Sequence, residues 1–203
     1  MDDRELLTRW AAGDATAGEA LFERHFDAVG RFFANKVDSG LEDLVQQTFL
    51  ACLESATRFR GDSAVRSWLL GIANNVLRNH YTALHRAPVP FATVSVEDLA
   101  PSVSRMLQLA QSQAALLTAL RRVPIDLQVV LELFFWEDMS GPEIASTLGL
   151  PEGTVRSRLR RGRELLGEMI GDETVLGAAK RETRDDLDRW SAELRARAVR
   201  PPS

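Results

Sequence analysis

The sequence predicts an all-α protein with two small helical domains, at 1–86 and 105–171, joined by a flexible linker at 87–104 and followed by a helical tail at 172–203. Apolar residues recur at helical spacing, and no stretch shows the alternation typical of a strand. The linker contains three prolines and no helical stripe. A chain of 203 residues is also long enough for two units that each bury a core.

The first domain is expected to hold four helices, which glycine-containing turns separate. They cover about 2–12, 15–37, 41–57 and 63–85. In the second domain we expect helices over about 105–122, 126–137, 142–148 and 154–170. Ser140 and Glu143 have the spacing of a capping box at the start of the short third helix, and Gly149 ends that helix. A short helix, a glycine turn and a basic helix predict a helix-turn-helix.

Composition excludes several classes of protein. The chain is 45% apolar and 27% charged, as in soluble globular proteins, and it has no apolar run near 18 residues. Its acidic opening, MDDRELLTRW, lacks the basic start of a signal peptide. One cysteine, Cys52, allows no internal disulfide, which suits the cytoplasm. We find no metal-ligand, phosphate-loop or nucleophile motif, so we expect no enzyme activity, metal, cofactor or small-molecule substrate.

Charge is unevenly distributed along the chain. The net charge is −4, yet 58–86 carries five arginines against Asp62 alone, and a second group of arginines lies in 152–171. Two basic patches on an acidic protein indicate two contacts with a polyanion. In the last helix of the second domain, the side opposite the apolar stripe carries Arg156, Ser157, Arg160 and Arg161, which suits the major groove, although a solvated surface is the alternative.

The third helix places one apolar residue on its polar side. Leu50 points away from the core stripe, together with Asp43 and Gln47, whereas Cys52 belongs to the stripe. An exposed leucine framed by an acid and an amide resembles a docking surface for a basic protein, and a stray surface leucine is the alternative.

The fourth helix has an outward face without acids. That face comprises Ser67, Gly71, Asn74, Arg78, Thr82 and His85. Beside it, Phe59 and Tyr81 could stack on an unpaired base or simply pack in the core.

Taken together, the motifs ALFERHF, EDLVQQTFLACL, RFRGDSAVRSWLLGIANNVLRNH and LRRVPIDLQVVLELFFWEDMSGPEIASTLGLPEGTVRSRLRRGRELL resemble the extracytoplasmic-function (ECF) group of bacterial RNA polymerase sigma factors. They cover about 5–85 and 115–167, in the order of that family. The resemblance implies a cytoplasmic bacterial protein that binds core RNA polymerase at the beta prime coiled coil and the beta flap. It also implies promoter DNA and an anti-sigma factor as partners, and no membrane contact.

The resemblance assigns roles to matching positions. Core polymerase is expected at Asp43, Gln47 and Leu50. The −10 element, with a flipped base, is expected at Phe59, Arg60, Asp62, Ser63, Asn75, Arg78 and Asn79. The −35 element is expected at Thr154, Arg156, Ser157, Arg160, Arg161 and Arg163.

Two residues and the tail depart from the family pattern. Asn74 and Gln47 stand where many relatives have other residues. The 172–203 tail extends past the usual end of the family and is a latch, a partner contact or a solvated helix.

The alternative functions are a stand-alone helix-turn-helix regulator, which would dimerise and bind duplex DNA without polymerase, and a nucleic-acid-processing enzyme, for which no reactive site is found.

Overall fold

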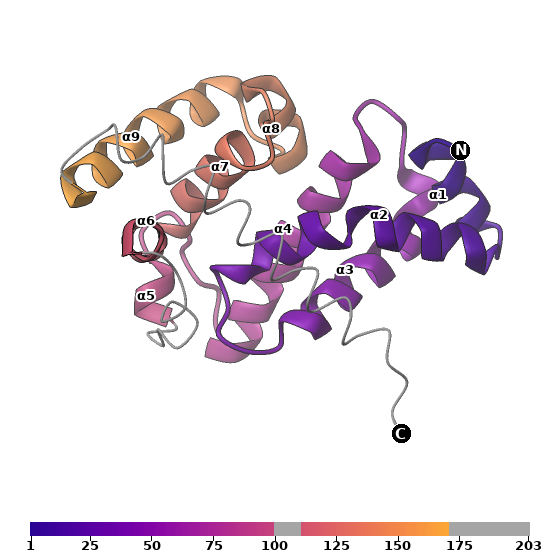
Figure 1. The fold of residues 1–203 in the computed structure, drawn as a ribbon, viewed down its shortest axis with the longest axis horizontal. Coiled ribbons are helices and arrows are strands. Elements are labelled where there is room, and N and C mark those ends of the chain that lie inside the picture. The colour runs from indigo at the N-terminus through magenta and orange to yellow at the C-terminus, as the bar shows by residue number, and fades with distance from the viewer. Residues whose placement is uncertain (100–110, 171–203) are drawn as a thin grey trace.

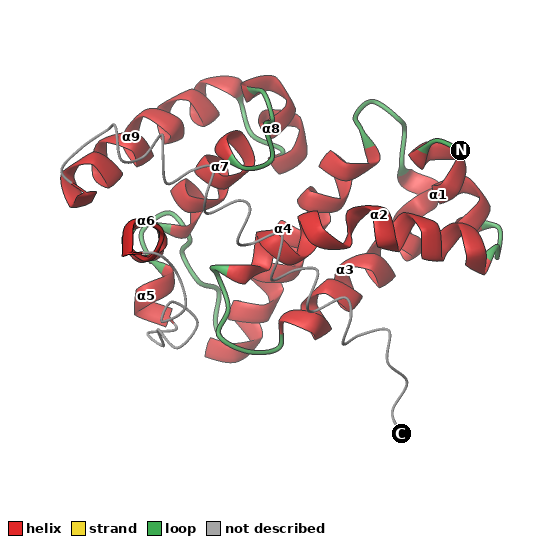
Figure 2. Cartoon of the chain, viewed as in Figure 1, coloured by secondary structure: helices red, strands yellow, loops and turns green. Residues whose placement is uncertain are grey.

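The computed structural model describes residues 1–99 and 111–170, and over these ranges its regular secondary structure is helical (Figure 1). Figure 2 shows helices joined by loops, without a strand in the described ranges. A single isolated β-bridge there joins Ser95 and Pro124. The all-α prediction is confirmed. The tail that was predicted to be helical, 172–203, lies outside the described residues.

The first domain consists of four helices. They are α1 (Asp3–Ala11), α2 (Ala15–Ala34), α3 (Leu41–Ser55) and α4 (Val65–His85), with a 3-10 turn at Ala56–Arg58 after α3. Side-chain caps begin the first two helices, because Asp2 accepts a hydrogen bond from the Glu5 amide and Asp14 from the Ala17 amide. All four helices pack around one another, with α2 contacting α1, α3 and α4.

The second domain contains the predicted helix-turn-helix. Its helices are α6 (Gln111–Arg122), α7 (Ile125–Phe135), α8 (Gly141–Leu148) and α9 (Glu152–Ile170). The capping box at the start of α8 is formed in both directions between Ser140 and Glu143. Gly149 ends α8 in the left-handed conformation, with a φ of +65°. The helix expected over 105–122 is described from Gln111 onward.

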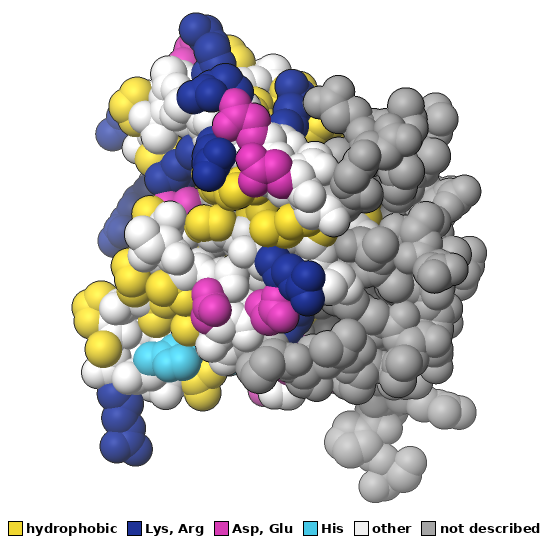
Figure 3. All heavy atoms as spheres, turned by 90° about the vertical axis from the view of Figure 1, so that its left-hand side faces the viewer, with side chains coloured by type: hydrophobic (Ala, Val, Ile, Leu, Met, Phe, Trp, Pro, Cys, Tyr) yellow, Lys and Arg dark blue, Asp and Glu magenta, His cyan; other side chains and the backbone are white. Residues whose placement is uncertain are grey.

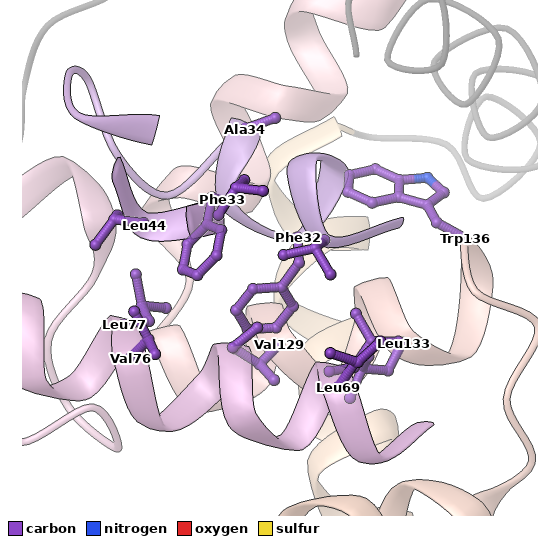
Figure 4. Close-up of a cluster of buried hydrophobic side chains, with 14 of the residues drawn as sticks. Phe32, Phe33, Ala34, Leu44, Leu69, Val76, Leu77, Val129, Leu133 and Trp136 are labelled. Atoms are coloured by element: carbon purple, nitrogen blue, oxygen red, sulfur yellow. The ribbon is translucent and has the colours of Figure 1, made fainter. Parts of the chain in front are cut away.

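The two domains share one apolar core. Figure 4 shows Phe32 and Leu69 from the first domain in one cluster with Val129 and Leu133 from α7. All four side chains are at most 3% exposed. Burial of this kind stabilises an interface at about 25 cal/mol per Å² of apolar surface removed from water. The domains are therefore packed together, with α4 lying against α8.

The linker is folded onto the second domain as far as Leu99, and it contains a helix where none was predicted. A short helix, α5 (Val96–Leu99), lies within it, and Phe91 and Val96 are buried. The cause is a local cap: an Asp98 carboxylate oxygen accepts hydrogen bonds from the Ser95 amide at 2.9 Å and the Ser95 hydroxyl at 2.7 Å. The Phe91 carbonyl then accepts the Asp126 amide at 3.0 Å, which ties the linker to the start of α7.

Domain packing also corrects the prediction for the acid-free face of α4. Ser67 and Asn74 were expected to point to solvent, but each is only 7% exposed. Gly71 lies between them on the same face, and a Cβ added there would come within 2.7 Å of the Thr147 carbonyl oxygen in α8. The face does point away from the core of the first domain. The second domain covers its first half, whereas Thr82 and His85 at its other end are exposed, as predicted.

Candidate polymerase and nucleic-acid interfaces

α3 presents an isolated apolar side chain to solvent, as predicted. Leu50 is 57% exposed, and Asp43 and Gln47 are exposed beside it. The opposite face of α3 is buried through Leu44 and Phe49, among others. Because the core stripe is complete without Leu50, its exposure is not a requirement of the fold. Its chemistry suits a partner surface that combines an apolar hollow with basic groups.

The FRGDS turn lies between the 3-10 turn and α4. The Phe59 ring packs on Trp68, with 4.9 Å between the ring centroids. Gly61 has a φ of +77°, a conformation that favours glycine. Arg60 and Asp62 are exposed and Ser63 is half-buried. Phe59 thus has a packing partner, and the polar groups of the turn point outward. Tyr81, the other aromatic considered for stacking on a base, is 1% exposed and packs in the core.

The remaining residues predicted for −10 DNA lie along α4. Asn75 and Asn79 are exposed. Arg78 forms an ion pair with Asp126 of α7, and its guanidinium lies 4.5 Å from the Phe91 ring centroid. The structure therefore leaves the two asparagines accessible and engages Arg78 between the domains.

Ion pairs line the contact between the domains, and we call this set the interdomain seam. The Glu137 carboxylate accepts Arg31 at 2.9 Å and also pairs with Arg66. Asp126 pairs with Arg78 of α4 and, at 2.8 Å, with Arg158 of α9. The set is completed by two further contacts, Lys36–Glu132 and Arg121–Asp38. Three acids of the second domain, Asp126 and Glu132 of α7 and Glu137 just after it, thus neutralise basic groups of the first domain.

The Lys36–Glu132 pair is the most deeply buried part of the seam. Lys36 is 0% exposed and Glu132 is 4% exposed. Burial lowers the pKa of Lys36, although the Glu132 charge opposes this shift, and burial likewise raises the pKa of Glu132 against the influence of Lys36. Glu132 also accepts the Gln128 amide at 2.8 Å. The pair is fully desolvated, so each charge depends on the other.

α9 carries the predicted basic surface. Arg156, Ser157, Arg160, Arg161 and Arg163 are all exposed, whereas Thr154 is half-buried. In Figure 3, Lys and Arg side chains gather toward the top of the face that is drawn, the level at which α9 lies in Figure 1.

The apolar side of α9 anchors it to the domain. Val155 and Leu166 are buried, and Gly162 lets the helix approach Leu131. On the basic side, Arg160 pairs with Glu164 at 2.6 Å, and the Arg163 guanidinium lies 5.1 Å from the Phe135 ring centroid. The predicted stripe and its opposite basic face are both confirmed.

Sequence reasoning missed three functional candidates. Asp126 and Arg158 were not singled out, because their pairing depends on how α7, α4 and α9 meet. Arg4 of α1 contacts the FRGDS turn from 56 positions earlier in the chain, and no local pattern indicates this. The Ser95–Asp98 cap, in contrast, had a readable signal in its S-x-x-D spacing.

The described ranges give little support for a metal site or a reactive thiol. No group of three or more His, Cys, Asp or Glu side chains there could hold a metal ion. Cys52 is buried, and burial raises the pKa of its thiol to about 12, so the prediction of a packing role is confirmed. No helix within 1–99 and 111–170 is both long and apolar enough to cross a membrane.

Comparison with known families identifies the class of protein. Residues 21–87 match sigma-70 region 2, and residues 113–166 match sigma-70 region 4. These segments contain α4 with the preceding turn and the helix-turn-helix.

The relatives narrow the class further. The ECF RNA polymerase sigma factor SigM of Mycobacterium tuberculosis is 33% identical over 83% of this chain and 85% of its own length. The RNA polymerase sigma-H factor of Pseudomonas aeruginosa is 30% identical over 83% of this chain and 93% of its own length. The chain belongs to the ECF group of RNA polymerase sigma factors.

Solved structures give the same fold. CnrH, in complex with the cytosolic domain of CnrY, superposes with a TM-score of 0.61 at 26% identity, over 84% of this chain and 98% of CnrH. The sigma factor RpoE of Bartonella quintana, in complex with the anti-sigma factor NepR, superposes with a TM-score of 0.57 at 18% identity. That superposition covers 76% of this chain and 97% of RpoE.

Proposed function

We propose that this sigma factor binds core RNA polymerase, directs it to a narrow set of promoters and opens the DNA at their −10 element. The observation that carries the proposal is the combination, in one chain, of an exposed face on α3 that suits a protein partner with the polar FRGDS turn before α4 and the exposed basic surface of α9. A stand-alone regulator has no use for the first of these features. Family membership supports the same assignment.

Docking on the polymerase is assigned to Asp43, Gln47 and Leu50. The leucine supplies apolar contact, and the acid attracts a basic helix of the beta prime coiled coil. A second contact, between the second domain and the beta flap, fits the family. The chemistry of RNA synthesis belongs to the polymerase, and this chain contributes binding energy.

The −10 element is assigned to the FRGDS turn and to α4. Phe59, Arg60, Asp62 and Ser63 would surround a flipped base, while Asn75, Arg78 and Asn79 contact the neighbouring strand. Unstacking a base costs a few kcal/mol, which a preformed pocket offsets. Arg78 must exchange Asp126 for DNA, because its guanidinium is held by that carboxylate in the packed structure.

The −35 element is assigned to α9. Arg156, Ser157, Arg160 and Arg161 lie on its exposed side, and Thr154 and Arg163 flank them. An arginine fork can bond guanine O6 and N7 together, so one such contact is worth about 1–3 kcal/mol of discrimination.

Control by an anti-sigma factor in the bacterial cytoplasm completes the proposal. CnrH was solved with CnrY, and RpoE with the anti-sigma factor NepR, and both share this fold. We infer a protein partner of the same kind for this chain, one that conceals the polymerase-binding face.

Transcription in vitro tests the proposal. Purified chain and sigma-free core polymerase are incubated on sheared genomic DNA, and the transcript 5′ ends are sequenced. Defined starts that share two spaced motifs are expected. Arg160→Ala should then weaken initiation by about 1–3 kcal/mol at promoters with the preferred −35 sequence. Arg122→Ala, which removes an exposed arginine paired with Glu97, is the matched control. Tight dimeric binding to duplex DNA without starts would favour the stand-alone regulator.

A further inference from the structure

The first helix reaches across the domain to the FRGDS turn. Arg4 Nη2 donates a hydrogen bond to the Arg60 carbonyl oxygen at 3.0 Å. The Arg4 guanidinium also occupies the space that a side chain on Gly61 would fill, and Gly61 has a φ of +77°. One charged group therefore contacts two consecutive residues of the turn. α1 lies outside the segment that matches sigma-70 region 2, which begins at residue 21.

α1 is anchored firmly enough to act as a support for the turn. Leu6 and Leu7 are 3% and 2% exposed. Asp3 accepts from His25 Nε2 at 2.8 Å and pairs with Arg24, so it ties the start of α1 to α2. Partial burial would raise the pKa of Asp3, but the hydrogen bonds and charges of Arg24 and His25 outweigh this and lower that pKa.

An open pocket of ≈460 Å³ lies between α1 and the turn. One wall comes from Asp2, Asp3 and Arg4, together with Arg24 of α2, and the other comes from Phe59, Ser63 and their neighbours. The two carboxylates and two guanidinium groups of this lining balance in charge, so the pocket lacks the net positive charge that suits a phosphate. Carboxylate acceptors, guanidinium and hydroxyl donors and an aromatic ring do match the edge and face of a nucleobase.

We infer that α1 forms the second wall of the pocket for the flipped −10 base, and that Arg4 is a positioning residue that holds the FRGDS turn in its capturing conformation. The inference rests on the proposed function. Arg4 acts through the backbone of the turn. Without it the turn must be ordered at the moment of capture, which costs conformational entropy for each residue that is fixed.

Open-complex formation on a mapped promoter of this sigma factor tests the inference. Holoenzyme carrying wild-type chain, Arg4→Ala or the control Arg9→Ala is titrated on the intact promoter, and DNA opening is followed by permanganate reactivity. Arg9 is exposed on the same helix but pairs with Asp14, away from the pocket. The titration is repeated on promoters with one abasic non-template position in the −10 element.

We expect Arg4→Ala to reduce opening of the intact promoter about tenfold, the effect of one charged hydrogen bond. Arg9→Ala should match the wild type. At the abasic position that impairs the wild type most, Arg4→Ala should cause no further loss, because no base is left to capture. Arg4→Lys, which keeps a donor, should recover part of the activity.

Two results would overturn this inference and leave the proposed function intact. One is normal promoter opening by Arg4→Ala, and the other is a tenfold loss of opening that persists at every abasic position. Because Arg4 is exposed, its replacement is not expected to unfold the chain, and thermal unfolding of the variant checks this. A wild-type chain that opens no promoter overturns the proposed function, and this inference with it.

Discussion

Replacing Glu132 by leucine leaves the Lys36 ammonium without its partner inside the packed molecule. Lys36 is 0% exposed, and apart from Glu132 its Nζ donates to the Phe32 carbonyl oxygen. One backbone carbonyl does not balance a full charge. The variant must therefore hold an uncompensated charge, lose the Lys36 proton at a cost of several kcal/mol, or separate the two domains so that water reaches Lys36.

The size of the effect follows from burial. Removing one partner of a buried ion pair costs about 3–5 kcal/mol, whereas replacing both partners by apolar groups is often neutral. Glu132→Leu should therefore lower the free energy of unfolding by about 3–5 kcal/mol. If separating the domains costs less than this, the cost of separation sets the size of the loss. Lys36→Met combined with Glu132→Leu should restore most of the stability.

Urea unfolding of the wild type, both single variants and the double variant gives the coupling energy by a double-mutant cycle. Small-angle scattering of the same samples reports whether the domains separate. Suppose that the free energy of unfolding of Glu132→Leu is within about 0.5 kcal/mol of the wild-type value, a shift typical of surface sites, and that its radius of gyration is unchanged. Then Lys36 is hydrated in solution, and the argument for a closed interdomain seam is refuted.

Three further outcomes are expected. Gly71→Leu should increase the radius of gyration, because its Cβ would lie 2.7 Å from a carbonyl oxygen of α8, whereas Gly167→Leu, with nothing within 4 Å of its Cβ, should not. Asp43→Arg combined with Leu50→Ala should abolish co-elution with core polymerase and leave the circular dichroism spectrum unchanged, since both side chains are exposed. The lowered pKa of Asp3 stabilises the fold above its ordinary value near 4, and this contribution is lost as pH falls through the lowered value. Thermal melts at several pH values should therefore show a smaller decline in stability below pH 4 for Asp3→Asn than for the wild type.

The helices of each domain could be predicted from the sequence because their determinants are local. Ser140 and Glu143 are three residues apart, and Gly149 marks the end of α8 by its own conformation. The exposure of Leu50 also followed from helical spacing alone. The basic side of α9 was readable for the same reason.

The seam could not be predicted, because the charges that pair in it are far apart in the chain. Lys36 and Glu132 are separated by 96 positions, and Arg31 and Glu137 by 106. The face of α4 lacks acids of its own, so it was predicted to meet DNA. The acid that pairs with Arg78 on this face, Asp126, comes from α7, and its position depends on how two complete domains pack.

The packed linker also stores length. Residues 88–99, if drawn out, would add roughly 40 Å of contour, at the reach of an extended chain. In the closed molecule this length is held by Phe91, which contacts Arg78 and whose carbonyl bonds the Asp126 amide. The exchange of Asp126 for DNA that we propose for Arg78 would remove the contact between Arg78 and the Phe91 ring. DNA binding at the −10 element would then weaken the hold on a linker whose extension places the second domain on a distant element.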